Sequence, residues 1–396
     1  MSRRFRTVLS MLLVIGIVAA AQPAYALTVT PDDTWQVKGR VYALARSGDT
    51  IFLGGKFKKL LGPTGNPKPA ALNVAALDMT TGEPVPGFAA SVTNTLKSGA
   101  AEVRALAVSN DGSTLYLGGK FDTVNGELHA NLAAVSATDG SLIPGFQVDA
   151  NKPVNALLAG SDLVYFGGDF KRVNSKPRKF LGAVSLDGAL SNDWKPSADN
   201  TIRSLETATD GNTVFVGGKF LTMNGVARTS VARVSSTDGS LDPWAIPPGV
   251  IDSGNPAWDL LATGNRLYGG FGNGPNYAAA FRLDNGTTGT QLWRRNTVGN
   301  IQGLAFNADG SRLFLAGHYG TGGLQQTACG VNLRGLMMVD PNTGTIDCSW
   351  IPQLVPFGSN FVGAWPLIST PTQLWVGGFF TSISGEPQQG IARFTL

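Results

Sequence analysis

The chain repeats one short pattern, and this repetition constrains its fold more than any other feature. The segment YALARSGDTIFLGGKF, starting at Tyr42, recurs as RALAVSNDGSTLYLGGKF from Arg104 and as RSLETATDGNTVFVGGKF from Arg203. Weaker copies bring the total to seven, and each copy ends on a pair of small residues. The second members of these pairs are Gly55, Gly119, Gly168, Gly218, Gly270, Gly317 and Gly378. Such a regular period indicates one repetitive architecture rather than several unrelated domains.

Each copy has the pattern of four β-strands. A first strand with a central leucine leads through a tight turn, such as Asp111-Gly112, into a second strand that ends at the glycine pair. A third, alternating strand leads through a turn such as Asp139-Gly140 into a fourth strand with an aromatic anchor. The anchors are Phe88, Phe146, Trp194, Trp244, Trp293 and Trp350. A period of about 50 residues with four strands predicts an all-β fold, a single seven-bladed β-propeller over residues 27–396.

The two ends of the chain are predicted to complete one blade together. After Trp365 the sequence supplies only three strands, the last at 391–395, and no fourth. The segment TPDDTWQVKGRVYAL, from Thr30, matches the join SNDWKPSADNTIRSL between two other copies, so Trp35 is the seventh anchor. We therefore predict that residues 29–37 pair with the C-terminal strand and close the ring, which removes exposed sheet edges.

The repeat also resembles known families. Its double-glycine strand ending resembles kelch repeats. The fuller pattern is GGKF, an Asn-Gly loop, LAAV, Asp-Gly, and then Pro-Gly-Phe or Asp-Pro-Trp. It resembles the delta-60-type repeats of secreted bacterial β-propellers and, more distantly, fungal cell-surface polarity-marker propellers. The resemblance covers essentially all of the chain after residue 26 and implies the fold, but no particular chemistry. Copies five and six depart from it, because Phe271-Gly272 and His318-Tyr319 replace the Lys-Phe step.

Residues 1–26 have the features of a secretory signal peptide. Arg3, Arg4 and Arg6 precede an apolar run over residues 8–21, and Ala24-Tyr25-Ala26 matches a cleavage site. A membrane anchor is the alternative, but the run is short for a bilayer span and a cleavage site follows it. We expect a protein exported to the extracellular space or the cell envelope, with no membrane span in its mature form.

The formal charge of the chain limits the classes of partner that we expect. Removing the three arginines of residues 1–26, which hold no acidic residue, lowers the formal charge from +4 to +1. No basic run or strongly basic balance remains, so we do not expect a nucleic-acid partner.

The only cysteines are Cys329 and Cys348. In an exported protein they are expected to form a disulfide, with two free thiols as the alternative.

One position differs in chemistry between otherwise similar copies. The second residue of the first strand is polar or aromatic in every copy, while its neighbours are mostly apolar or small. These residues are Tyr42, Arg104, Asn155, Arg203, Trp258, Gln302 and Trp365. We expect them beside the central channel, on the face that carries the long connections 58–72, 89–101, 245–256, 320–332 and 351–362. Such side chains can hold a carboxylate, phosphate or sugar by bidentate bonds and stacking; packing between blades is the alternative.

A second ring of candidates follows the glycine pairs, although a solvated rim explains it as well. Its members are Lys56, Lys120, Asp169, Lys219, Phe271, His318 and Phe379. His129 is expected at the surface, and Glu102, Glu206 and Asp259 are scattered acids without a motif. Hairpin turns explain the Asp-Gly pairs more simply than calcium sites do. We expect neither a metal nor a cofactor.

The sequence therefore favours a monomeric, secreted binding module that recognises an extracellular glycan, peptide or protein on its long-loop face. No nucleophile elbow, metalloprotease helix or phosphate loop is present in the sequence. The alternative is an extracellular polysaccharide hydrolase or lyase with an acid and a base at the channel mouth.

Overall fold

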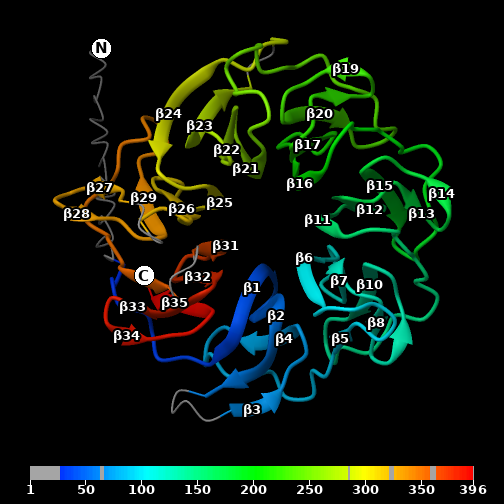
Figure 1. The fold of residues 1–396 in the computed structure, drawn as a ribbon, viewed down its shortest axis with the longest axis horizontal. Helices are drawn as coiled ribbons and strands as arrows, with labels where there is room; N and C mark the ends of the chain where they lie inside the picture. The colour runs from blue at the N-terminus through cyan, green and yellow to red at the C-terminus, as the bar shows by residue number, and fades with distance from the viewer. Residues whose placement is uncertain (1–26, 63–66, 284–285, 321–324, 357–362, 396) are drawn as a thin grey trace, which may run out of the picture.

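The computed structural model describes residues 27–62, 67–283, 286–320, 325–356 and 363–395. These residues form β-strands and their connections and contain no helix, so the predicted all-β class is confirmed. The predicted signal peptide, residues 1–26, lies outside the described residues. Figure 1 shows the strands gathered into sheets that are arranged around a common centre.

Each sequence copy forms one antiparallel sheet in which the first strand lies nearest the centre (Figure 1). The first strands are β1 (Gln36–Ser47), β6 (Glu102–Val108), β11 (Val154–Ala159), β16 (Ile202–Thr207), β21 (Ala257–Thr263), β25 (Ile301–Phe306) and β31 (Ala364–Ser369). The second strands are β2 (Thr50–Leu61), β7 (Thr114–Lys120), β12 (Leu163–Gly168), β17 (Thr213–Gly218), β22 (Arg266–Phe271), β26 (Leu313–Gly317) and β32 (Gln373–Gly378). The third strands are β4 (Val74–Asp78), β10 (Leu132–Ser136), β15 (Leu181–Ser185), β20 (Val231–Ser235), β23 (Asn276–Arg282), β29 (Leu336–Val339) and β35 (Ile391–Thr395).

The predicted fourth strand forms a full ladder with the third strand in one copy. There β24 (Gln291–Thr297) pairs with β23 along its length. In other copies the described residues make only a single bridge, such as Val135 to Leu142 and Val234 to Leu241. In these two copies a proline, Pro144 or Pro243, follows the bridge, and proline has no N–H to donate to a ladder.

Short hairpins occupy the connections beyond the glycine pairs. They are β8 (Thr123–Val124) with β9 (Glu127–Leu128), β13 (Arg172–Val173) with β14 (Lys176–Pro177), β18 (Thr222–Met223) with β19 (Val226–Ala227), β27 (Thr327–Ala328) with β28 (Val331–Asn332), and β33 (Phe380–Ile383) with β34 (Glu386–Pro387). Three further short strands pair with strands already named. They are β3 (Pro67–Ala70) with the end of β2, β5 (Val92–Thr93) with β8, and β30 (Leu354–Pro356) with β33. In the turn Asn125-Gly126 both φ angles are positive, as a two-residue hairpin turn requires.

The predicted aromatic anchors join neighbouring sheets. Trp194 and Trp244 are fully buried. The Trp194 indole N–H donates to the carbonyl of Ser235 in the next sheet at 2.9 Å, and Trp293 donates to the carbonyl of Pro341 at 2.8 Å. Trp194 and Trp293 therefore each tie the outer part of one sheet to the next sheet.

Cys329 and Cys348 form the predicted disulfide, with their Cα atoms 5.6 Å apart. The bond joins the turn between β27 and β28 to the outer segment before the Trp350 anchor. It therefore staples two connections of the same copy that no ladder links.

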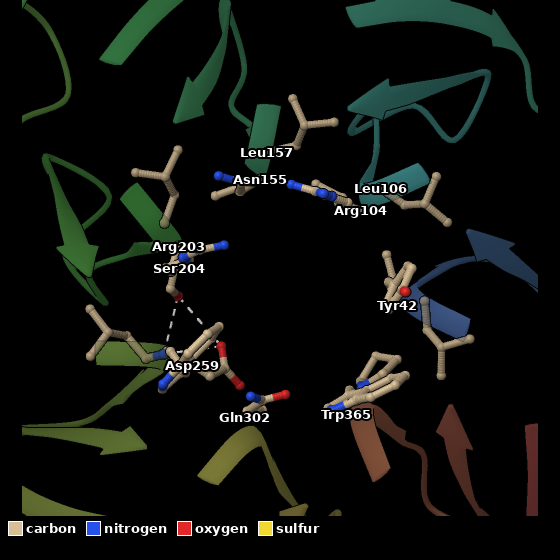
Figure 2. A pocket seen from close by; sticks show the side chains of 18 of the residues that line it. Tyr42, Arg104, Leu106, Asn155, Leu157, Arg203, Ser204, Asp259, Gln302 and Trp365 are labelled. Carbon is tan, nitrogen blue, oxygen red and sulfur yellow. Dashed lines mark hydrogen bonds between the residues drawn. The ribbon is translucent and has the colours of Figure 1, made fainter. Parts of the chain in front are cut away.

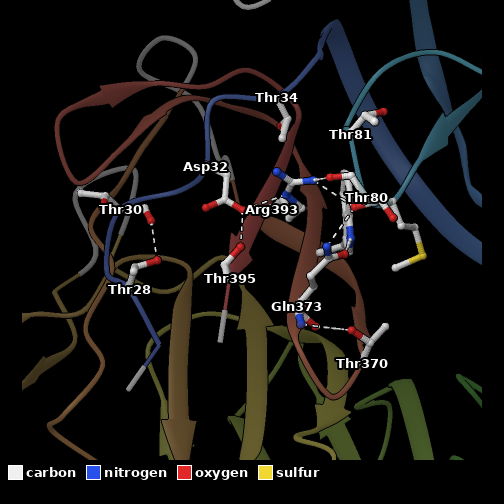
Figure 3. A network of polar contacts seen from close by, with 12 residues as sticks. Thr28, Thr30, Asp32, Thr34, Thr80, Thr81, Thr370, Gln373, Arg393 and Thr395 are labelled. Atoms are coloured by element: carbon white, nitrogen blue, oxygen red, sulfur yellow. Dashed lines mark hydrogen bonds and ion pairs between the residues drawn. The ribbon is translucent and has the colours of Figure 1, made fainter. Parts of the chain in front are cut away.

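The two ends of the chain meet beside β35, but through separate hydrogen bonds. Asp32 N–H donates to the carbonyl of Arg393 at 2.8 Å, and Val37 N–H donates to the carbonyl of Gln389 at 3.0 Å. The Asp32 carboxylate also accepts from Arg393 Nε and Thr395 Oγ1, each at 2.7 Å (Figure 3). Residues 27–35 are not assigned to a strand, so the ladder predicted over residues 29–37 is absent from the described part of the chain.

Candidate functional site

Every first strand carries a β-bulge at the polar or aromatic position singled out from the sequence. In the first copy Val41 pairs with Gly55 and Ala43 pairs with Gly54, which leaves Tyr42 without a partner. The same irregularity leaves out one residue in each of the next five copies, and in the last copy it falls at Trp365 and Pro366. A bulge releases one side chain from the alternation of the strand and re-aims it. The polar or aromatic position found in the sequence is therefore the bulge position.

The glycine pair has a separate physical reason at each of its two positions. A Cβ on Gly55 would lie 1.9 Å from the carbonyl oxygen of Arg40, the residue just before the bulged pair. A Cβ on Gly54 would lie 2.6 Å from Cγ1 of Val103 in the next sheet. The second glycine thus makes room for the bulge, and the first allows close approach of neighbouring sheets. The motif that defines the repeat is the sequence signature of the bulge.

Copy five is shifted by one residue from the predicted alignment. Ala257 pairs with Phe271 and Asp259 pairs with Gly270, so Phe271 takes the place that Gly55 has in copy one. Phe271 is fully buried. Its predicted place in the rim ring is therefore wrong, and Gly272 stands there instead.

The seven bulge residues line one central cavity of about 640 Å³. Figure 2 shows Tyr42, Arg104, Asn155, Arg203, Gln302 and Trp365 around it, each on the innermost strand of a different sheet. The wall also includes Glu102, Glu206, Asp259 and His318. The structure brings together the whole set of residues singled out from the sequence, and their use by a ligand stays a prediction.

One side of the cavity is a chain of polar contacts. Arg104 donates from Nη2 and Nε to one oxygen of Glu102, at 2.8 and 3.0 Å, and from Nη1 to Asn155 Oδ1 at 3.1 Å. Asn155 in turn donates to Asp169 at 3.1 Å. Lys56 approaches the other oxygen of Glu102 at 3.5 Å. Burial opposes ionisation of Glu102, but Arg104 and Lys56 outweigh it and lower the pKa of Glu102. The hydrogen bonds to Glu102 and Asn155 hold the Arg104 side chain in place.

The other side holds aromatic rings and a second arginine. The Arg203 guanidinium lies 5.0 Å from the ring centre of Trp258, a cation–π distance. The rings of Tyr42 and Trp365 are 5.2 Å apart, and the Trp365 indole N–H donates to His318 Nε2 at 2.7 Å. Burial, with a smaller contribution from the Arg40 charge, lowers the pKa of His318 to about 4. His318 is therefore neutral at pH 7.

Two carboxyl groups of the cavity wall have raised pKa values. Asp259 accepts from the N–H groups of Leu260 and Leu304, at 3.0 and 2.9 Å, and Glu206 accepts from Ala262 N–H at 3.1 Å. Burial raises the pKa of Asp259 to about 7. Burial, together with the nearby charge of Asp259, raises the pKa of Glu206 to about 8. Such perturbed groups occur at functional sites and also in structural networks.

The sequence interpretation left these two acids unplaced, although one signal was present. The residues equivalent to Glu206 in the other copies are all apolar: Ala45, Ala107, Leu158, Leu261, Ala305 and Ile368. A single carboxyl group at a position where every other copy is apolar marks one side of the cavity as chemically different.

These raised pKa values give the first prediction. The folded protein holds a proton on Glu206 that the unfolded chain releases, so stability falls as pH rises through the folded pKa. We expect the melting temperature to decrease between about pH 6.5 and pH 9, a range above the ordinary pKa values of histidine and carboxyl groups. Glu206→Gln should flatten this decrease, and the exposed Glu127→Gln should not. Calorimetry that gives equal slopes for all three proteins would contradict the raised pKa.

The rim candidates do not form one site. His318 lines the central cavity, Lys56 borders both Glu102 and a second pocket, and Asp169 lies in the polar chain described above. Lys219 is exposed, Lys120 is half-buried, and the Arg40 guanidinium lies 4.4 Å above the ring of Phe379. His129 is 2% exposed, so its predicted surface position is wrong.

The described residues contain no group of three or more His, Cys, Asp or Glu side chains placed to hold a metal ion. Within the same residues there is no helix with the length and apolar character needed to cross a membrane.

One copy of the repeat matches a known protein family. A family model described as "Domain of unknown function (DUF5122) beta-propeller" matches residues 210–243, which run from the turn before β17 to the outer segment of the same copy. No curated protein matches the chain. The family match covers only this one copy. The β-propeller fold in the family's description agrees with the arrangement of the sheets around a common centre (Figure 1).

Solved structures extend the likeness over nearly the whole chain. The structure of U3-55K is 11% identical, with 92% of this chain and 99% of that chain covered and a TM-score of 0.59. The RRP9 WD40 repeats are 10% identical, with coverage of 93% and 99% and a TM-score of 0.56. The extracellular domain of a putative one-component system from B. thetaiotaomicron is 13% identical, with coverage of 92% and 39% and a TM-score of 0.55. Likeness at these identities shows the fold, and together with the sheet arrangement it identifies the chain as a β-propeller.

Proposed function

We propose that this β-propeller has seven blades in a closed ring, is exported after removal of residues 1–26, and works as an extracellular binding module. A Cβ on Gly377 of the last sheet would lie 2.7 Å from Cγ1 of Val41 in the first sheet. The equivalent distance from Gly118 to Val154 is 2.8 Å. The last sheet thus packs on the first as closely as other neighbours pack, which supports closure. The disulfide supports export, since such bonds persist in oxidising compartments.

The ligand is proposed to bind in the central cavity, and Arg203 carries this proposal. Its guanidinium projects from a bulge into the cavity wall and makes no hydrogen bond or ion pair with any described residue. Burial is the main cause of its lowered pKa, which the charge of Asp169 opposes. A half-buried guanidinium without hydrogen-bonding partners is poised for an external acceptor.

The surroundings of Arg203 indicate the class of ligand. Trp258 and Trp365 offer flat apolar surface, and Asn155 and Gln302 offer amide groups. Guanidinium with aromatic and amide groups suits a carboxylate-bearing sugar or peptide, which the arginine binds while a ring stacks on it. We therefore favour an acidic glycan or an acidic peptide among the extracellular ligands expected from the sequence.

Catalysis is the second candidate because of Asp259 and Glu206. Both line the same cavity, and their raised pKa values let them keep a proton near neutral pH. A protonated carboxyl group is what a polysaccharide hydrolase or lyase uses as its general acid. Their hydrogen bonds to strand N–H groups equally suit a structural role, so binding remains the favoured function.

An array of glycans and peptides, probed with the protein starting at residue 27, tests both candidates. Binding of an acidic member should weaken by about tenfold to a hundredfold in Arg203→Ala, because a charged hydrogen-bonded contact contributes about 1.5 to 3 kcal/mol. The exposed Arg172→Ala serves as a control of equal charge. Absence of binding, or binding that Arg203→Ala leaves unchanged, would contradict the cavity proposal. Release of shorter products, lost in Asp259→Asn, would favour the enzyme instead.

A further inference from the structure

A second pocket lies between the first and second sheets, away from the seven bulge residues. Its volume is about 1080 Å³. Lys38, Lys56, Lys58 and Lys59 line it from β1 and β2, and residues 99–101 with Asn94 line it from the connection that leads to β6. We call this pocket the lysine groove.

The positive charge of the lysine groove is largely uncompensated. Lys38, Lys58 and Lys59 are exposed, and their ammonium groups make no hydrogen bond or ion pair with the described part of the chain. Lys56 has one partner, Glu102, at 3.5 Å. Lys120 adds to the charge, since its Nζ lies 4.0 Å from the place of a Cβ on Gly99. None of the described lining residues is acidic. Clustered charge of one sign along a pocket concentrates ligands of the opposite sign.

The wall opposite the lysines is held in place before any ligand arrives. The Asp122 carboxylate accepts from the N–H groups of Thr95, Leu96 and Lys97, at 2.7, 3.0 and 2.8 Å. Asn94 Nδ2 donates to the carbonyl of Gly99 at 3.0 Å and closes the same loop. A pre-formed wall reduces the entropy lost on binding.

We propose that the lysine groove binds a polysaccharide segment that carries carboxylate groups. Lysine ammonium groups are point charges without a fixed planar geometry, so a row of them suits repeated anionic groups in flexible spacing. Leu72, which is half-buried, gives the groove apolar surface for the C–H face of a sugar ring. The aromatic residue of the described lining, Phe57, is only 3% exposed and offers no platform on which nucleic-acid bases stack. This proposal does not rest on the central cavity.

Oligogalacturonate is the probe, with dextran oligomers of the same length as the neutral comparison and oligo(dT) as the nucleic-acid comparison. At low ionic strength we expect oligogalacturonate to bind and dextran not to bind. Affinity should fall at least tenfold on raising salt from about 0.02 to 0.3 M, because the groove is open to solvent. Lys58→Ala with Lys59→Ala should lower the affinity by about tenfold. Lys176→Ala with Lys179→Ala, exposed and in the third copy, makes the same charge change elsewhere and should leave affinity unchanged.

Several results would overturn the lysine groove as a glycan site. If dextran binds as tightly as oligogalacturonate, binding does not depend on the ligand's charge. If both lysine double variants have the same affinity, the ligand does not bind at Lys58 and Lys59. Tighter binding of oligo(dT) would assign the groove to nucleic acid. Arg104→Ala with Arg203→Ala separates the two sites: loss of oligogalacturonate binding in this variant, with none in Lys58→Ala/Lys59→Ala, assigns the polymer to the central cavity.

Discussion

Replacing Gly119 by alanine is expected to destabilise the protein by about 3 kcal/mol and to abolish ligand binding in the central cavity. The added Cβ would lie 2.0 Å from the carbonyl oxygen of Glu102 and 3.0 Å from Cα of Val103. Both neighbours are backbone atoms, so no side chain can move aside. Relief requires a change of the bulge itself, and the bulge sets the direction of Arg104. Stability and binding should therefore fail together.

Urea unfolding followed by circular dichroism measures the first effect, and titration with a ligand from the array measures the second. Gly274→Ala is the matched control, because its added Cβ would meet Asn255 only at an ordinary contact distance of 3.6 Å. Gly119→Ala with unchanged stability and unchanged binding would show that the bulge does not depend on glycine.

Removing residues 27–35 is expected to destabilise the entire sheet array, by about 3 to 5 kcal/mol, the range found for loss of one large aromatic anchor. The segment supplies Trp35, which packs against the buried cluster that includes Val37 and Trp375. It also supplies Asp32, which bonds to Arg393, while Arg393 donates to the carbonyls of Met79 and Thr80 in the first sheet at 2.9 Å each (Figure 3). This segment thus joins the last sheet to the first.

A chain that starts at Thr30 is the control, since it keeps Asp32 and Trp35 but lacks Thr28, whose carbonyl accepts from the Trp350 indole at 3.0 Å. We expect this control to unfold near the full protein in one transition, and the chain starting at Gln36 to unfold at lower temperature. Equal calorimetric transitions for the chains starting at Thr30 and Gln36 would mean that the ring is not closed through this segment.

The sequence predicted much of the fold because the repeat carries its own constraints. Glycine pairs, Asp-Gly turns and aromatic anchors recur in register, so the residue pattern alone aligns the positions of Tyr42 and Arg104 across copies. The sequence alignment placed copy five one residue out of register, because it matched the glycine pair of YGGF to the glycine pairs of the other copies. The pairing of Ala257 with Phe271 shows the correct register. The outer strand failed as a ladder where a proline interrupts it, as at Pro144 and Pro243.

The chemistry of the candidate site was less accessible to sequence reasoning. A pKa depends on burial and on which groups meet, so Asp259 and Glu206 read as scattered acids until their strands were placed side by side. The lysine groove was missed for the same reason. Lys38 on β1 and Lys58 and Lys59 on β2 become one surface only when the two strands pair and a loop of the next copy closes the pocket.

A crystal structure of the protein with the first acidic ligand from the array would show directly where the ligand binds. We expect electron density in the central cavity, with the ligand's anionic group on Arg203 and an apolar part against Trp258 or Trp365. An empty central cavity, with ligand density only in the lysine groove or elsewhere on the surface, would rule out the central cavity as the binding site.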